Sequence, residues 1–98
     1  MLENKQLAVI VARYVFPSMR SFSTGWVARV GSLEARLSET AAGAQILVVD
    51  GESPCYAIAV SGSVVEATSS GETRGFKINN LTEVPAVAKK IRRFFEAC

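Results

Sequence analysis

Histidine is absent from this 98-residue sequence, and cysteine occurs only twice. Without histidine the usual general base near neutral pH is missing, so Ser-His-Asp and Cys-His nucleophile arrangements are excluded. Cys55 and Cys98 are too few for the disulfide framework of a small secreted domain, and they cannot complete a common zinc site. We therefore expect both thiols to be reduced, and Cys55 to be a small buried side chain within its apolar run rather than a nucleophile.

Other signatures of chemistry are missing as well. The glycines occur singly or in turns, so no glycine-rich run is present to cradle a phosphate. The acidic residues are scattered one at a time, which leaves a two-metal site without support. The longest apolar run near the N-terminus, residues 7–12, is too short to cross a bilayer and precedes no cleavage pattern. We therefore predict a non-enzymatic cytoplasmic protein that uses no metal or cofactor and does not associate with a membrane.

The length of 98 residues predicts one compact domain, residues 1–98, and a composition of 49% apolar and 20% charged residues predicts that it folds. Positive charge is unevenly distributed along it. Residues 1–80 carry seven Lys or Arg and seven Asp or Glu, whereas residues 81–98 carry four and two. The whole net charge of +2 therefore lies in the last eighteen residues.

That C-terminal segment, residues 81–98, predicts a single amphipathic helix. Its apolar residues recur at the i, i+3, i+4, i+7 spacing that places side chains on one helix face: Val84, Val87, Ala88, Ile91, Phe94, Phe95 and Cys98. The other face carries the basic residues Lys89, Lys90, Arg92 and Arg93. Thr82 is suited to cap the helix start, and Pro85 is acceptable in a first turn whose amides lack intrahelical partners.

The remainder of the chain predicts short strands. Residues 6–16 are rich in β-branched and aromatic types and end at Pro17, which indicates a first strand that is apolar on both faces. Gly31-Ser32 lies between two periodic runs and predicts a type II′ hairpin pairing Val30 with Leu33, Arg29 with Glu34 and Trp26 with Leu37. A competing interpretation makes residues 33–42 a helix capped by Ser32.

Further strands are expected over residues 44–50, 55–60, 63–68 and 75–78, with a flexible loop over residues 68–73. Together these elements predict an α+β fold. We expect a twisted, mainly antiparallel sheet of five to seven short strands, with the C-terminal amphipathic helix packed on one face. The first strand is apolar on both faces, and one helix covers only one of them. A homodimer is the simplest source of a second cover, and a heterologous partner or a sheet that curls into a half-barrel are the alternatives.

Two surfaces are candidates for partner binding. The basic helix face, Lys89, Lys90, Arg92 and Arg93, could neutralise a few phosphates. The helix dipole also favours cations near a C-terminus, however, so a plain solvated face explains the same pattern. The second candidate is the loop over residues 16–24, whose Met19, Arg20 and Phe22 are types enriched at protein interfaces. The alternative for this loop is that Met19 and Phe22 cover the edge of the core.

Because these residues supply contact surfaces and no chemistry, they favour non-catalytic binding to another protein, as an inhibitor or adaptor of a larger complex. Compact proteins of this kind are common among phage and mobile-element products that block host machinery, including anti-CRISPR inhibitors. That analogy rests on size and composition and on no shared motif. The alternative is a small nucleic-acid-binding protein that uses the basic face of the C-terminal helix.

Overall fold

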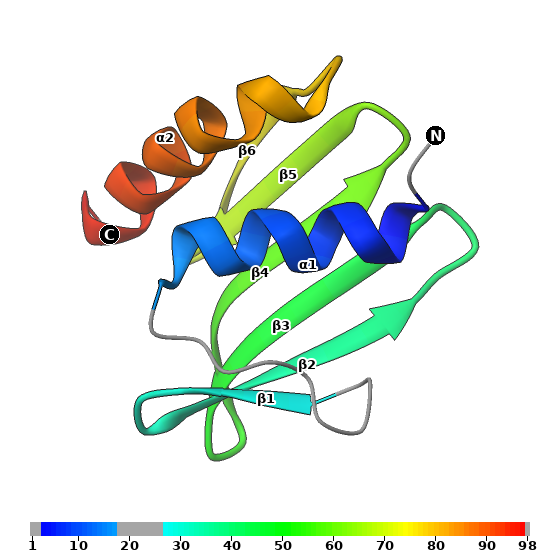
Figure 1. Cartoon of the computed structure of the whole chain (residues 1–98). Coiled ribbons are helices and arrows are strands. Elements are labelled where there is room, and N and C mark those ends of the chain that lie inside the picture. The colour runs from blue at the N-terminus through cyan, green and yellow to red at the C-terminus, as the bar shows by residue number, and fades with distance from the viewer. Residues whose placement is uncertain (1–2, 18–26, 98) are drawn as a thin grey trace.

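The computed structural model describes residues 3–17 and 27–97, which form an α+β fold as the sequence predicts. The strands are β1 (Val27–Val30), β2 (Leu33–Glu39), β3 (Ala44–Asp50), β4 (Ser53–Ser61), β5 (Val64–Ser69) and β6 (Glu72–Lys77). They pair in sequence order, each antiparallel to the next. Two helices, α1 (Asn4–Val15) and α2 (Val84–Ala97), lie on one face of this sheet (Figure 1). The 3-10 turn η1 (Leu81–Glu83) leads into α2.

The first element is a helix, so the strand predicted over residues 6–16 is wrong. The buried residues of α1 follow a helical period: Leu7, Ala8, Val11, Ala12 and Val15. The Gln6 side-chain oxygen accepts a hydrogen bond from the Glu3 backbone N–H at 3.1 Å, which satisfies one amide at the helix start. β-Branched residues lower helix propensity only slightly, and packing of the apolar face outweighs that cost.

This correction also affects the expected homodimer. The apolar residues of this segment form one buried helix face instead of two sheet faces, and that face packs against β3 and β4. Residues 6–16 therefore leave no spare strand face for a second chain to cover.

The hairpin at Gly31-Ser32 is confirmed. Val30 pairs with Leu33 and Arg29 with Glu34, so residues 33–39 form a strand and the helical interpretation is wrong. Gly31 has a φ of 60° while Ser32 stays at negative φ, as a type II′ turn requires. The expected partnership of Trp26 with Leu37 lies outside the described residues.

The loop expected over residues 68–73 is instead a tight hairpin between β5 and β6. Ser70 and Gly71 have φ values of 54° and 82°, and two consecutive positive values characterise a type I′ turn, whose twist matches that of the flanking strands. Strand β6 therefore begins at Glu72, earlier than the predicted start at residue 75. The strand predicted over residues 44–50 is confirmed as β3.

Cys55 lies at a β-bulge. Val48 pairs with Tyr56 and Val49 with Pro54, which leaves Cys55 without a partner on β3. Its thiol is partly exposed, with Sγ 3.8 Å from the carbonyl oxygen of Ser53. The expectation that Cys55 is buried is therefore wrong, because the bulge interrupts the regular alternation of inward and outward side chains along β4.

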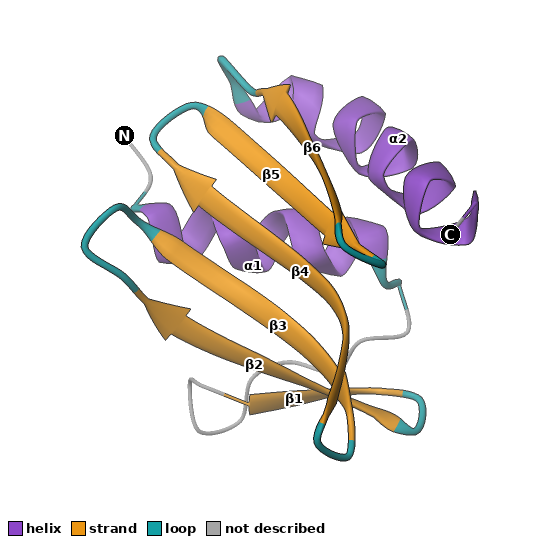
Figure 2. Cartoon of the chain, turned by 180° about the vertical axis from the view of Figure 1, so that it is seen from behind, coloured by secondary structure: helices purple, strands orange, loops and turns teal. Residues whose placement is uncertain are grey.

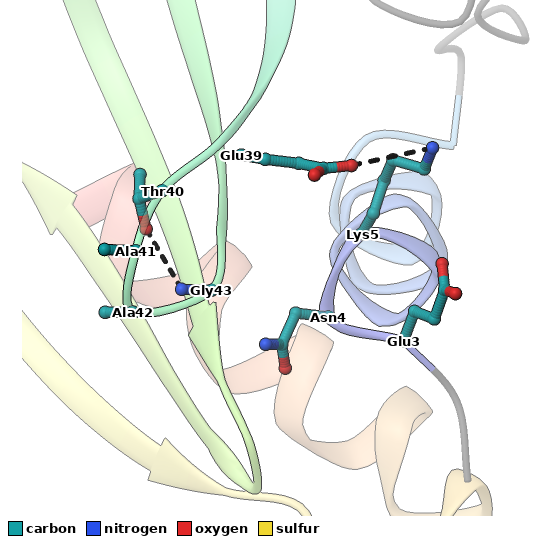
Figure 3. Close-up of a pocket in the computed structure, with 8 residues that line it drawn as sticks. All are labelled: Glu3, Asn4, Lys5, Glu39, Thr40, Ala41, Ala42 and Gly43. Atoms are coloured by element: carbon teal, nitrogen blue, oxygen red, sulfur yellow. Dashed lines mark hydrogen bonds and ion pairs between the residues drawn. The ribbon is translucent and has the colours of Figure 1, made fainter.

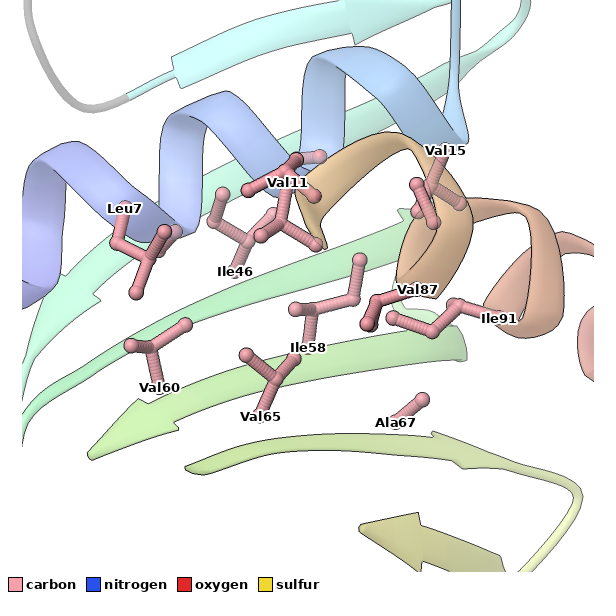
Figure 4. Close-up of a cluster of buried hydrophobic side chains, with 14 of the residues drawn as sticks. Leu7, Val11, Val15, Ile46, Ile58, Val60, Val65, Ala67, Val87 and Ile91 are labelled. Carbon is pink, nitrogen blue, oxygen red and sulfur yellow. The ribbon is translucent and has the colours of Figure 1, made fainter. Parts of the chain in front are cut away.

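The core lies between the two helices and the sheet (Figure 4). Side chains from α1 and α2 meet the inward positions of the central strands, among them Val11, Ile46, Ile58, Val65 and Ile91, all fully buried. At one end of this layer the ring of Phe95 stacks on Tyr56, with 4.5 Å between ring centroids, and on Phe16 at 6.0 Å. The aromatic stack joins α2 to β4 and to the end of α1.

The apolar face predicted for the C-terminal helix is confirmed in α2, except that Cys98 lies outside the described residues. Its buried residues are Val84, Val87, Ala88, Ile91, Phe94 and Phe95. The cap differs from the prediction, because Asn80 caps the preceding turn: its side-chain oxygen accepts a hydrogen bond from the backbone N–H of Thr82 at 3.0 Å. The Thr82 hydroxyl also bonds to that same oxygen, so Thr82 is held by the cap instead of providing it.

Candidate functional site

The structure describes one of the two surfaces proposed from the sequence. Met19, Arg20 and Phe22 lie outside the described residues, so the loop over residues 16–24 stays a prediction. The basic residues of α2 are described, and all of them are exposed: Lys89, Lys90, Arg92 and Arg93.

Two of these four basic residues line the same concave site. Lys90 and Arg93 line a hollow of 300 Å³ between α2 and the edge strand β6, whereas Lys89 and Arg92 do not line it. We name this site the basic groove and define it by its lining residues, Arg74, Phe76, Lys90, Arg93, Phe94 and Ala97. Figure 2 shows α2 and β6 at this margin of the sheet, where they diverge toward the C-terminal end of α2.

The register of the β5–β6 hairpin places the strand residues of the groove. Arg74 pairs with Ala67 and Phe76 with Val65, and both of those β5 residues are buried beneath the helices. Paired residues project to the same face of a sheet, so Arg74 and Phe76 face the helix layer too. Strand β6 is the outermost strand of the sheet, and its side chains Arg74 and Phe76 form one wall of the groove. Residues of α2 form the other wall.

The groove combines an apolar floor with unpaired positive charge. The guanidinium carbon of Arg74 lies 5.2 Å from the ring centroid of Phe94, within the range of a cation–π interaction. Within residues 3–17 and 27–97, none of Arg74, Lys90 and Arg93 forms an ion pair. The nearest acid along β6 is Glu72, which faces the helix layer but does not line the groove.

The helix dipole accounts for little of this pattern. No basic residue lies in the last turn of α2, and the favourable effect of the helix end on a cation falls off within that turn. Arg74 belongs to a strand, so the dipole of its own element does not explain it. Arg74, Lys90 and Arg93 line the same hollow, so three positive charges from a strand and a helix surround it.

A second hollow, of 310 Å³, lies where the start of α1 meets the β2–β3 turn (Figure 3). Lys5 Nζ lies 3.7 Å from an oxygen of Glu39, and Glu3 lines the hollow as a second acidic residue. The Gly43 N–H donates to the Thr40 hydroxyl at 3.0 Å, which fixes the turn itself. These interactions give the hollow a structural role.

A third hollow, of 660 Å³, is lined by Leu7, Gly62, Ser63, Ile78, Asn79, Asn80 and Leu81. No charged residue lines it, and two of its polar groups have internal partners. Asn80 caps η1, and the Gly62 N–H donates to the Asn4 side-chain oxygen at 3.0 Å. This hollow therefore offers a ligand little polar recognition.

Comparisons with known proteins add no functional information: no family model matches the chain, and no curated protein or solved structure matches it significantly. In the part of the chain that the structure describes, no helix is long and apolar enough to cross a membrane. The same residues contain no group of three His, Cys, Asp or Glu side chains that could hold a metal ion. The basic groove is thus the candidate site, on its geometry and charge.

Proposed function

We propose that this chain is a non-catalytic domain that binds another protein, as an inhibitor or adaptor of a larger complex, through the basic groove. The observation that supports the proposal is the gathering of Arg74, Lys90 and Arg93 around an apolar floor without a carboxylate partner. Such a site suits an acidic side chain next to an apolar one, because the partner's carboxylate supplies the missing negative charge.

The groove suits a protein better than a nucleic acid. Nucleic-acid sites need a track of cations along the backbone and aromatic faces on which bases stack. Here Lys89 and Arg92 lie outside the groove, and the Phe94 ring already carries the Arg74 guanidinium over its face. A hollow of 300 Å³ accommodates a few side chains and no extended strand of nucleotides.

A pair of charge-reversal variants tests the proposal. Lys90→Glu with Arg93→Glu reverses the charge inside the groove, and Lys89→Glu with Arg92→Glu makes the same change on the same helix outside it. All four residues are exposed, so both variants should retain the wild-type melting temperature. In affinity purification from the native host, we expect the groove variant to lose a protein partner that the control variant and the wild type retain.

The contrary outcomes are equally specific. Equal retention or equal loss by the two variants contradicts the groove as the docking site, and so does recovery of no protein at all. Recovery of nucleic acid alone supports the rival function. In that case affinity for the nucleic acid falls by orders of magnitude between about 50 mM and 200 mM salt, because phosphate contacts release counterions.

A further inference from the structure

The outer edge of β6 carries backbone groups without partners, and the hairpin register shows which ones. A two-residue turn makes Ser69 and Glu72 a hydrogen-bonded pair, and bonded and non-bonded pairs then alternate along an antiparallel ladder. Arg74 and Phe76 therefore direct their N–H and C=O groups toward β5. The Ile78 N–H donates to the Ser63 carbonyl oxygen at 2.8 Å, which continues the same alternation.

The residues between them direct their backbone groups outward. Thr73, Gly75 and Lys77 present N–H and C=O groups at the open edge, where no described strand pairs with β6. An edge of this kind is a template for one more strand. It runs beside the basic groove, so a segment that pairs there also reaches the cations of α2.

Gly75 stands in the middle of this edge. Its φ is not positive and an added Cβ would meet no atom within 4 Å, so neither a turn nor internal packing requires glycine there. Glycine weakens a strand interior and often marks a place where another backbone approaches closely. Its central place on the open edge is therefore consistent with an incoming strand.

We propose that an extended segment of the partner protein pairs with the outer edge of β6 as a seventh strand and places an acidic and an apolar side chain, two residues apart, in the basic groove. The spacing follows from the strand period, because the groove-facing neighbours Arg74 and Phe76 are themselves two residues apart. The acidic side chain meets the cations, and the apolar side chain packs beside Phe76 and Phe94. This inference rests on the proposed function and adds the chemistry and conformation of the partner.

Two displayed libraries of linear peptides, selected on the immobilised full chain, test the spacing. One library fixes an Asp or Glu two positions from a Phe, Leu or Ile. The other fixes the same residues at adjacent positions, which sends the two side chains to opposite faces of a strand. We expect enrichment from the first library only. Equal enrichment from both, or from neither, overturns the proposal.

Proline variants test the backbone pairing with a synthetic copy of the enriched peptide. Gly75→Pro removes an outward N–H and leaves the ladder with β5 intact, because proline is tolerated at an edge position whose N–H faces away from the sheet. Arg29→Pro makes the matching change on β1, at the opposite edge, where the hairpin register also directs this N–H outward. We expect Gly75→Pro to weaken peptide binding by about tenfold or more, and Arg29→Pro to leave it unchanged.

A second measurement on the wild-type chain does not depend on how the proline variants fold. Hydrogen exchange followed by NMR should show slower exchange of the Thr73, Gly75 and Lys77 amides when the peptide is bound. Unchanged exchange at all three amides overturns strand addition. If the Lys90 and Arg93 charge reversal abolishes partner capture while Gly75→Pro does not, the proposed function stands and this inference fails. If neither variant affects capture, both fail.

Discussion

Gly43→Ala tests the close approach between the β2–β3 turn and strand β4. A Cβ at this position would lie 1.9 Å from the carbonyl oxygen of Val60 and 3.1 Å from the Cα of Ser61. Unbonded heavy atoms pack at about 3.5 Å or more, so the turn or the strand must move by more than about 1 Å. The obstructing atoms belong to the backbone, and no side-chain rotation relieves the overlap.

The turn has little freedom to move. The Ser61 hydroxyl donates to the Ala42 carbonyl oxygen at 2.8 Å, and the Gly43 N–H lies 3.2 Å from the Thr40 carbonyl oxygen. A shift that relieves the overlap strains these bonds, which places the cost near the upper end of overpacking effects. We expect a loss of about 3 kcal/mol in the free energy of unfolding, which lowers the melting temperature of a domain of this size by about 12–24 °C.

Gly75→Ala is the matched control, since the same substitution there meets no atom within 4 Å and φ is not positive. We expect no loss of stability and a gain of up to about 1 kcal/mol, because alanine loses less conformational entropy than glycine on folding into a strand. Thermal unfolding followed by circular dichroism measures both variants. If Gly43→Ala melts within about 2 °C of Gly75→Ala, the turn does not contact β4 as described.

Two further predictions concern stability and assembly. Ile91 is fully buried, so Ile91→Ala should lower the free energy of unfolding by about 2–5 kcal/mol in denaturant unfolding. Leu81→Ala, at a side chain 51% exposed, should cost much less. A loss at Ile91 as small as the loss at Leu81 would place α2 outside the core. Light scattering at micromolar concentration should give the monomer mass of 10.5 kDa. Among the residues whose side-chain burial the structure describes, only Tyr14, Val64 and Leu81 are large exposed hydrophobics, whereas stable interfaces bury about 1,200–2,000 Å². A measured mass twice as large would instead support the homodimer expected from the sequence.

The elements that sequence reasoning located share a strong local signal. In α2 a single apolar face repeats at the helical period over the whole segment, and at Gly31-Ser32 the turn chemistry and the pairing of Arg29 with Glu34 agree. Helix α1 could not be predicted from residue types, because its β-branched residues favour a strand even though their spacing fits a helix. Residues 6–16 alternate poorly, with apolar residues on both faces of the predicted strand. The same residues can form one apolar face of a helix, so the poor alternation itself indicates a helix.

The β5–β6 hairpin was missed for a different reason. Its turn requires Ser70 at positive φ, a conformation uncommon for residues other than glycine, so Ser70-Gly71 resembles ordinary loop composition. If residues 68–73 are taken as a loop, the predicted strand starts at residue 75. Arg74 then lies outside the strand, and the sequence does not assign it to a face of the sheet. The structure places Arg74 in the groove through its pairing with Ala67, and this pairing depends on the turn.

The basic groove therefore could be predicted only in part. The helical period identifies an exposed basic face on α2, but Lys89 and Lys90 differ by about 100° around the helix axis, and periodicity alone does not say which of them faces a neighbouring element. That choice depends on where β6 lies, because the strand supplies the other wall and the third positive charge, Arg74. Two exposed lysines that look equivalent in the sequence thus become unlike in the fold, and the paired charge reversals compare these two positions.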